Sequence, residues 1–172
     1  MTLIKTRARG LKLDDTFAFT GTVSGAGTLL NVAQGTNNTR TGISANNDFS
    51  LFSFSYNQQK ASSKIRIDVV LWGWAESSGS MNIEVGYDST YYKGFINHVY
   101  IAGSYTKPAF GSIFITGASS TGNKTVDIKY TSENSANARP FVTFNPNASD
   151  DARLGQTTSY ATVSEFDLWL LQ

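Results

Sequence analysis

The sequence predicts an all-β protein, an antiparallel β-sandwich with a jelly-roll-like arrangement. Short runs rich in β-branched and aromatic residues alternate with turns rich in Gly, Ser, Thr and Asn, as in all-β domains. Aromatic residues make up 13% of the chain and charged residues only 16%, and no segment keeps apolar residues at helical spacing. With 172 residues, the chain is long enough for one domain with a sizeable core.

The candidate strands can be followed along the chain. A short strand is predicted at 27–34, and a loop at 34–42. The run 48–56 places aromatic residues on one face and serines on the other, and 62–75 is the longest candidate. The remaining strands are predicted at 80–88, 110–117, 123–132, 139–145 and 157–171. About eight strands joined by turns are typical of two antiparallel sheets packed face to face.

Alternation along these strands separates a core face from an outer face. The residues predicted to be buried are Phe54, Ile67, Val69, Ile128, Val142 and Leu168. Large apolar residues also fall on faces that point away from the core: Val70, Trp72, Trp74 and Trp169. Such clusters are unusual on the surface of a monomer. Two interpretations remain open: loops of the same chain cover these residues, or they form an oligomer interface.

Residues 1–26 are predicted to form an N-terminal attachment arm with a Gly-rich hinge, and residues 27–172 a β-sandwich head domain. Four basic residues precede the first acidic one: Lys5, Arg7, Arg9 and Lys12. They are not followed by the apolar run and cleavage site of a secretory signal. A cationic extended segment of this kind can bind a groove or a sheet edge of a partner.

Composition argues against several classes of function. The net charge is only +1, which gives no sign of nucleic-acid binding. No apolar run approaches the ~20 residues of a membrane-spanning helix, so no membrane insertion is expected. The chain has no cysteine, which excludes disulfides, thiolate metal sites and a cysteine nucleophile.

Catalytic and metal-binding residues are sparse. The one histidine, His98, lies in an apolar setting, and no catalytic or phosphate-binding motif is present. Glu165 and Asp167 share a strand face, as two carboxylates for glycoside hydrolysis would, but nearly every strand has such a polar face. The Asn145–Asp151 loop offers oxygen ligands for calcium without the regular spacing of a calcium loop. We expect no enzyme, no cofactor and no metal.

Three tyrosines are candidates for glycan binding. Tyr91 and Tyr92 in DSTYYKG, and Tyr105 in GSYTKPAF, fall in turn-rich segments between predicted strands. Exposed aromatic rings beside polar groups suit sugar recognition, because the ring offers a flat apolar face and the polar groups fix orientation. The alternative interpretation is that these rings cover an edge of the sandwich.

Several segments, in this order, resemble the head domain of bacteriophage tail fibres and related virion surface proteins. They are SSKIRIDVVLWGWA, FITGASSTGNKTVDIKYTSENSANARPFVTFN and YATVSEFDL, and the likeness covers roughly residues 50–170. The opening TLIKTRARGLKLDDTFAFTGTVSG is similar to segments that attach such proteins to the virion. A long fibre normally has a shaft between anchor and head. This chain passes from arm to head across one short hinge, which favours a stubby fibre or a decoration protein.

The resemblance implies a non-enzymatic virion structural protein that forms a homotrimer at the particle surface. Its arm would bind other virion proteins of the capsid, portal-neck or tail, and its head could contact host surface polysaccharide. A carbohydrate-binding, lectin-like module is the alternative. A glycan-degrading enzyme is a third hypothesis.

Overall fold

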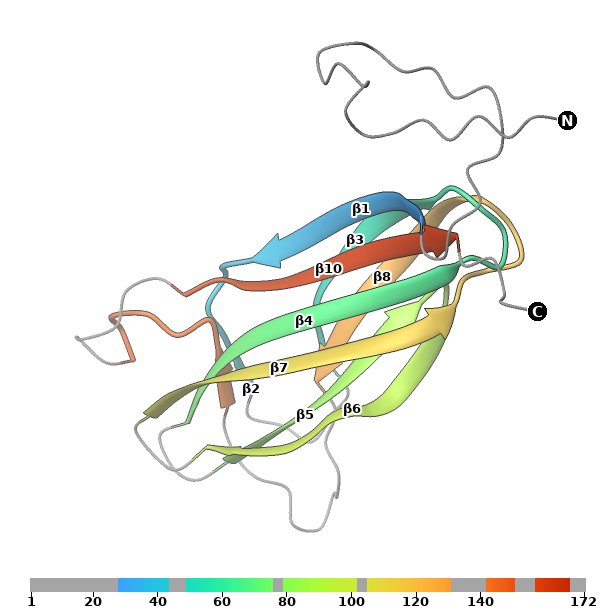
Figure 1. Ribbon diagram of the computed structural model, residues 1–172. Helices are drawn as coiled ribbons and strands as arrows, with labels where there is room; N and C mark the ends of the chain where they lie inside the picture. Colours follow the sequence, from blue (N-terminus) through green and yellow to red (C-terminus); the bar gives the residue numbers. More distant parts are fainter. Residues whose placement is uncertain are drawn as a thin grey trace, which may run out of the picture.

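The computed structural model describes residues 28–43, 49–75, 79–101, 105–130, 142–150 and 157–167. Within these ranges the regular structure consists of strands, with no helix (Figure 1). The ten strands are β1 (Thr28–Asn37), β2 (Thr41–Ile43), β3 (Phe49–Gln58), β4 (Lys64–Ala75), β5 (Gly79–Tyr87), β6 (Thr90–Ile101), β7 (Tyr105–Thr116), β8 (Gly122–Tyr130), β9 (Val142–Phe144) and β10 (Ser159–Asp167).

The strands form two antiparallel sheets that pack face to face, with the first sheet toward the viewer in Figure 1. In this front sheet, β10 pairs with β1 and β4, β4 pairs with β7, and β9 connects the far end of β4 to β2. The back sheet has the order β3-β8-β5-β6. Without the short β2 and β9, the strands divide as β1-β10-β4-β7 and β3-β8-β5-β6, which is the jelly-roll arrangement. The predicted fold class is confirmed.

The structure differs from the predicted strands in three places. The loop expected at 34–42 is largely strand, because β1 continues to Asn37 and β2 follows at Thr41. The strand β6 was not predicted, and β7 starts at Tyr105 instead of Phe110. The hairpin between β5 and β6 turns on Asp88 and Ser89, both with positive φ (49° and 68°). Two such residues suit a type I′ turn, whose usual signal, Asn-Gly or Asp-Gly, is missing here.

The core lies between the two sheets. The inward side of β4 is almost completely buried, with Ile65, Ile67, Val69 and Leu71 each 0–1% exposed. It packs with buried residues of the back sheet, which are Ile83, Val85, Val126 and Ile128. Burial is confirmed for Ile67, Val69 and Ile128, whereas Phe54 is only partly buried against this cluster. The side chain of Val142 and all of Leu168 lie outside the described residues.

A glycine allows the two sheets to approach closely at the β1–β3 edge. Gly35 on β1 is buried and faces Phe54 on β3. A Cβ added to Gly35 would lie 2.2 Å from Cδ1 of Phe54, a separation that heavy atoms do not reach. The ring of Phe54 therefore occupies the space that any other residue at position 35 would need.

A buried carboxylate connects the two sheets at one end of the sandwich. Glu165 lies on β10 and is 0% exposed. Its Oε2 accepts hydrogen bonds from the Tyr56 hydroxyl at 2.7 Å and the Gln59 amide at 2.8 Å. Its Oε1 accepts from the Lys60 amide at 2.8 Å and the Ser63 hydroxyl at 2.7 Å. Because Tyr56 is on β3, these bonds join the front sheet to the back sheet and to the β3–β4 turn.

The neighbouring Gln58 extends this network toward the β7–β8 connection. Its Nε2 donates to the carbonyl oxygens of Lys60 at 2.6 Å and Ala118 at 2.8 Å. Its Oε1 accepts from the Tyr87 hydroxyl at 2.7 Å and the Ala118 amide at 2.9 Å. Gln58 is 1% exposed, so a full set of partners offsets the cost of removing its amide from water.

The network sets the ionisation of its members. Burial raises the pKa of Glu165, but the hydrogen bonds from Gln59, Tyr56, Ser63 and Lys60 outweigh it and bring the pKa below its ordinary value. Burial also raises the pKa of Tyr56, and the hydrogen bond to Glu165 raises it further. At neutral pH a charged carboxylate therefore meets a neutral phenol that donates to it.

We expect Glu165 to make stability depend on pH on the acid side. Its folded-state pKa lies below the unfolded value, so its contribution is complete above the unfolded pKa and is lost as pH falls through the folded pKa. The free energy of unfolding of the wild type should fall once the pH drops below about 4.5. Glu165→Gln should lose about 3 kcal/mol at pH 7 and show a shallower acid slope. Urea denaturation from acid to neutral pH measures both, and an unchanged slope would contradict this assignment.

Truncation of the inward side of β4 should be costly. Ile67→Ala leaves a cavity in the fully buried core and should lower the free energy of unfolding by about 2–4 kcal/mol. Val32→Ala is the control, because Val32 is 49% exposed on β1 and its loss should change stability by less than about 0.5 kcal/mol. Equal midpoints of chemical denaturation for the two variants would show that the inner face is wrongly assigned.

Candidate functional site

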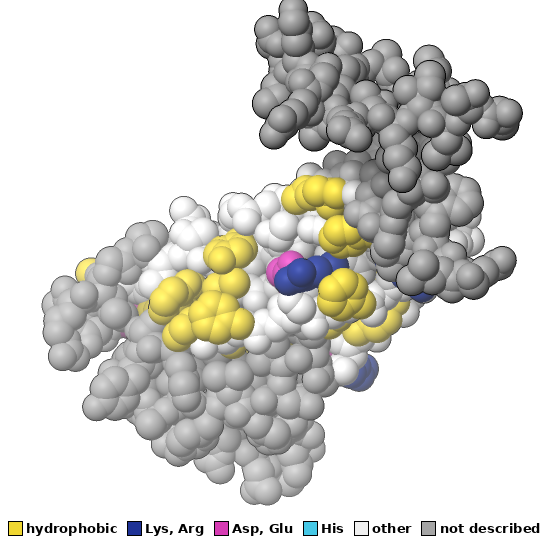
Figure 2. Space-filling view, in the orientation of Figure 1, with side chains coloured by type: hydrophobic (Ala, Val, Ile, Leu, Met, Phe, Trp, Pro, Cys, Tyr) yellow, Lys and Arg dark blue, Asp and Glu magenta, His cyan; other side chains and the backbone are white. Residues whose placement is uncertain are grey.

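The outer face of the front sheet carries a group of apolar side chains, here called the apolar patch: Val70, Trp72, Pro108, Phe110 and Tyr160. The strand register brings them together. Val70 pairs with Phe110 on one side and Tyr160 on the other, and Trp72 pairs with Pro108. Phe110 is 66% exposed, and the other members are half-buried. Figure 2 shows this group in yellow at one end of the face.

A charged pair separates the apolar patch from a second apolar group. Arg66 and Asp68 on β4 form an ion pair at 2.9 Å. Figure 2 shows basic and acidic side chains side by side near the centre of this face. The Ser112 hydroxyl donates to Asp68. Beyond this pair lies Phe114, which is 69% exposed and has the Arg66 guanidinium 5.6 Å from its ring centroid. The face therefore offers two apolar areas with a polar boundary between them.

The structure tests the position of only part of the predicted oligomer interface. Val70 and Trp72 do lie side by side on the outer face of β4. The side chain of Trp74 and all of Trp169 lie outside the described residues. Phe110, the most exposed member of the patch, was not predicted from the sequence. Alternation along its strand puts its side chain on the outer face, because the preceding Ala109 is buried. That these residues form an interface stays a prediction.

Two of the tyrosines proposed for glycan binding, Tyr91 and Tyr92, point to opposite faces of the back sheet. Tyr91 and Tyr92 lie on strand β6 and not in a loop, which corrects the prediction. Successive residues of a strand point to opposite faces. Tyr91 is 39% exposed, whereas Tyr92 packs against the core. Tyr105 begins β7, and its side chain lies outside the described residues, as do the arm residues Lys5, Arg7, Arg9 and Lys12.

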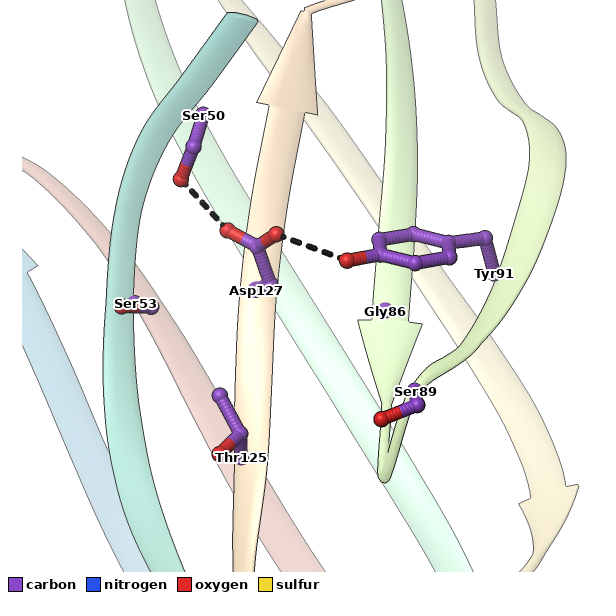
Figure 3. A pocket seen from close by; sticks show the side chains of 7 residues that line it. All are labelled: Ser50, Ser53, Gly86, Ser89, Tyr91, Thr125 and Asp127. Carbon is purple, nitrogen blue, oxygen red and sulfur yellow. Dashed lines mark hydrogen bonds between the residues drawn. The ribbon is translucent and has the colours of Figure 1, made fainter.

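A polar pocket lies on the outer face of the back sheet, beside Tyr91. It has a volume of about 220 Å³ and is lined by Ser50, Ser53, Gly86, Ser89, Tyr91, Thr125 and Asp127 (Figure 3). Asp127 is central: its Oδ1 accepts from the Ser50 hydroxyl at 2.6 Å and its Oδ2 from the Tyr91 hydroxyl at 3.2 Å. The sequence analysis found Tyr91 but not Asp127, because the pocket exists only through pairing of four strands.

The two acidic strand residues considered for hydrolysis are held by structural contacts. Glu165 is fully buried, and four donors occupy its oxygens. Asp167 accepts a hydrogen bond from the Lys60 ammonium group at 2.6 Å. Neither carboxylate lines the pocket. The only histidine, His98, lies on β6 with its side chain outside the described residues.

The loop considered for calcium has oxygens that are already engaged. Asn145 Oδ1 accepts from the Ser159 amide at 3.0 Å and its hydroxyl at 2.6 Å. Asp150 accepts from Nε of Arg40 at 2.9 Å and from the Asn147 amide at 3.0 Å. Asp151 lies outside the described residues. In the part of the chain that the structure describes, no cluster of three or more His, Cys, Asp or Glu side chains is arranged to bind a metal. Nor does any helix there have the length and apolar character to cross a membrane.

No protein-family model matches the chain, and no curated protein matches it in sequence. Among solved structures, it is similar to the VP2 subviral particle of infectious bursal disease virus, with a TM-score of 0.47 and 12% identity over 92% of this chain and 45% of that chain. The structure of the Gt strain of the virus has a TM-score of 0.47 and 13% identity, over 95% of this chain and 46% of that chain. The T13 viral particle has a TM-score of 0.44 and 12% identity, over 92% of this chain and 43% of that chain. This chain spans less than half the length of these viral proteins. At these scores and identities, the likeness identifies no family for it.

Proposed function

We propose that this chain is a structural protein of a bacteriophage particle, a short trimeric fibre or a decoration protein. Residues 1–26 attach it to capsid, portal-neck or tail proteins, and the β-sandwich head at the particle surface makes contact with the host. The apolar patch is the observation that carries the proposal, because it gives the head a surface suited to self-association. The particle context and the number three come from the resemblance of sequence segments to tail-fibre heads.

The size of the patch suits the centre of a subunit interface. Burying one large aromatic side chain removes roughly 150–250 Å² from water, and a standard interface buries about 800 Å² on each partner. Phe110, which is 66% exposed, would supply the largest share, and the half-buried Trp72 and Tyr160 would add smaller ones. The Arg66–Asp68 ion pair would lie at the polar rim. Closed rotational symmetry allows every subunit to use the same patch without forming open filaments.

The arm supplies the attachment in this proposal. An extended segment that adds to a sheet edge or lies in a groove gains main-chain hydrogen bonds as it becomes ordered. The four cations of the arm, Lys5, Arg7, Arg9 and Lys12, would add ion pairs with an acidic partner surface. A jelly roll by itself does not select this function, because the same fold occurs in viral capsid and lectin domains.

The oligomer is tested by a charge placed in the apolar patch. The wild type should have a mass of about three times 18.7 kDa by light scattering at micromolar concentration. Phe110→Glu should give folded monomers, because Phe110 is 66% exposed and its replacement disturbs little of the core. Ser55→Glu is the matched control: Ser55 is exposed on the outer face of the back sheet, so the variant should associate like the wild type. A wild-type mass of one chain would refute the oligomer.

The attachment role of the arm is tested by truncation. A protein without residues 1–20 should keep the circular dichroism and melting temperature of the head but should fail to join particles that lack the protein. Neutralising the four cations of the arm should weaken attachment of the full chain most at low salt, because exposed ion pairs are screened beyond ~8–10 Å at moderate ionic strength. Normal incorporation of the truncated protein would contradict the proposal.

A further inference from the structure

We propose that the polar pocket on the back sheet binds one ring of a neutral hexopyranose, stacked against Tyr91 and hydrogen-bonded to Asp127. This assigns the lectin-like alternative to one defined site. The inference depends on the pocket and not on the particle role, so the two can fail independently.

The first observation is the row of residues that crosses the sheet. Ser53 on β3 pairs with Asp127 on β8, which pairs with Gly86 on β5, and Gly86 pairs with Tyr91 on β6. A Cβ added to Gly86 would lie 2.7 Å from Cε1 and 3.0 Å from Cδ1 of Tyr91. The missing side chain thus makes room for one edge of the ring, and Figure 3 shows the ring crossing β5 with its hydroxyl toward Asp127.

The second observation is how the ring is held. The Lys129 ammonium group lies 3.8 Å from the centroid of Tyr91, over one face of the ring. The Tyr91 hydroxyl is bonded to Asp127 at 3.2 Å. Along β8, Thr125 and Lys129 lie on opposite sides of Asp127, and the pocket includes Thr125 but not Lys129. One face of the Tyr91 ring therefore contacts the Lys129 ammonium group, and the other face borders the pocket. A fixed aromatic face of this kind can stack on the C–H groups of a sugar at low entropic cost.

The third observation is the supply of hydrogen-bonding groups. Three hydroxyl groups line the pocket without a hydrogen-bond partner among the described residues: Ser53, Ser89 and Thr125. Each hydroxyl both donates and accepts, and each Asp127 oxygen has a lone pair beyond the one used by Ser50 or Tyr91. Several hydroxyls around one carboxylate match the several adjacent hydroxyls of a pyranose.

Charge and volume narrow the class of ligand. Among the described residues, Asp127 is the only charged one that lines the pocket, so an acidic sugar would meet repulsion there. The Lys129 ammonium group lies 3.9 Å from Asp127 Oδ2 and offsets part of its charge, which makes the site less attractive to a cation. The volume of about 220 Å³ is below the roughly 300–1,000 Å³ of pockets for drug-sized ligands. A single neutral sugar ring is compatible with both the charge and the volume of the pocket.

The experiment is a titration of the full chain followed by two-dimensional amide NMR. The probes are D-glucose, D-galactose and D-mannose, with D-glucuronate as the charged comparison. A hexose has about 12 non-hydrogen atoms, and an ordinary binding free energy per atom gives a dissociation constant on the order of 1 mM. At least one neutral hexose should shift the amides of the pocket, Ser53, Gly86, Ser89, Thr125 and Asp127, with saturation in this range. Glucuronate should bind more weakly.

Variants separate the pocket from general surface effects. Tyr91→Ala removes the stacking face and should weaken binding about tenfold, whereas Tyr91→Phe keeps the ring and should weaken it less. Phe49→Ala is the matched control, because Phe49 is 41% exposed on the same sheet and does not line the pocket; it should bind like the wild type. If Tyr91→Ala does not fold, Thr125→Val removes one exposed pocket hydroxyl and should still weaken binding severalfold.

Three results would overturn the inference. The first is the absence of shifts at the pocket with all three neutral hexoses. The second is tighter binding of glucuronate than of glucose. The third is an equal loss of binding in Phe49→Ala and Tyr91→Ala. None of these results bears on the mass of the oligomer or on attachment through the arm. If the pocket binds no hexose, the proposed particle role is unaffected. If the chain is not a particle protein, the sugar-binding inference is unaffected.

Discussion

The structure at one end of the sandwich, where the β3–β4 turn lies, depends on the buried carboxylate of Glu165. This carboxylate belongs to β10 of the front sheet, yet its donors come from β3 of the back sheet and from the turn that joins β3 to β4. A buried charge of this kind is tolerated only because all of its strong acceptor positions are used. The bond from Tyr56 joins the two sheets directly, and the three bonds from the β3–β4 turn hold the turn to β10. Directional bonds of this kind restrict sliding of the sheets more than apolar packing alone does.

The network engages the polar groups of two buried side chains. At this end of the molecule, Glu165 and Gln58 use their polar atoms within the protein, and the Gln58 contacts fix both the β3–β4 turn and the β7–β8 connection. The acidic residue that looked most like a catalytic group from its strand position is thus part of the internal structure. Among the described residues, the apolar patch and the polar pocket both lie on the outer faces of the sheets.

The two faces differ in chemistry, and this difference suits two kinds of contact. On the front sheet, Phe110 and its neighbours present an apolar surface with one ion pair at its border, which favours a protein partner. On the back sheet, Asp127 and Tyr91 lie in a small pocket with three hydroxyls that have no hydrogen-bond partner among the described residues, which favours a small polyhydroxylated ligand. Because the faces lie on opposite sides of the sandwich, the proposed self-association through one would leave the other open.

The sequence by itself determined the fold class and the inner face of the longest strand. Alternation is a local property, so Ile67 and Val69 were assigned to the core correctly, and Val70 and Trp72 to the outer face. Strand β6 was missed because its hairpin turn uses Asp88 and Ser89 in place of the usual glycine. Only the tertiary structure decided that Tyr92 points inward, that Glu165 is buried, and that Asp127 and Tyr91 share a pocket across Gly86. These features depend on the pairing register of strands far apart in the chain, and register is set by packing of the whole sandwich and not by any one segment.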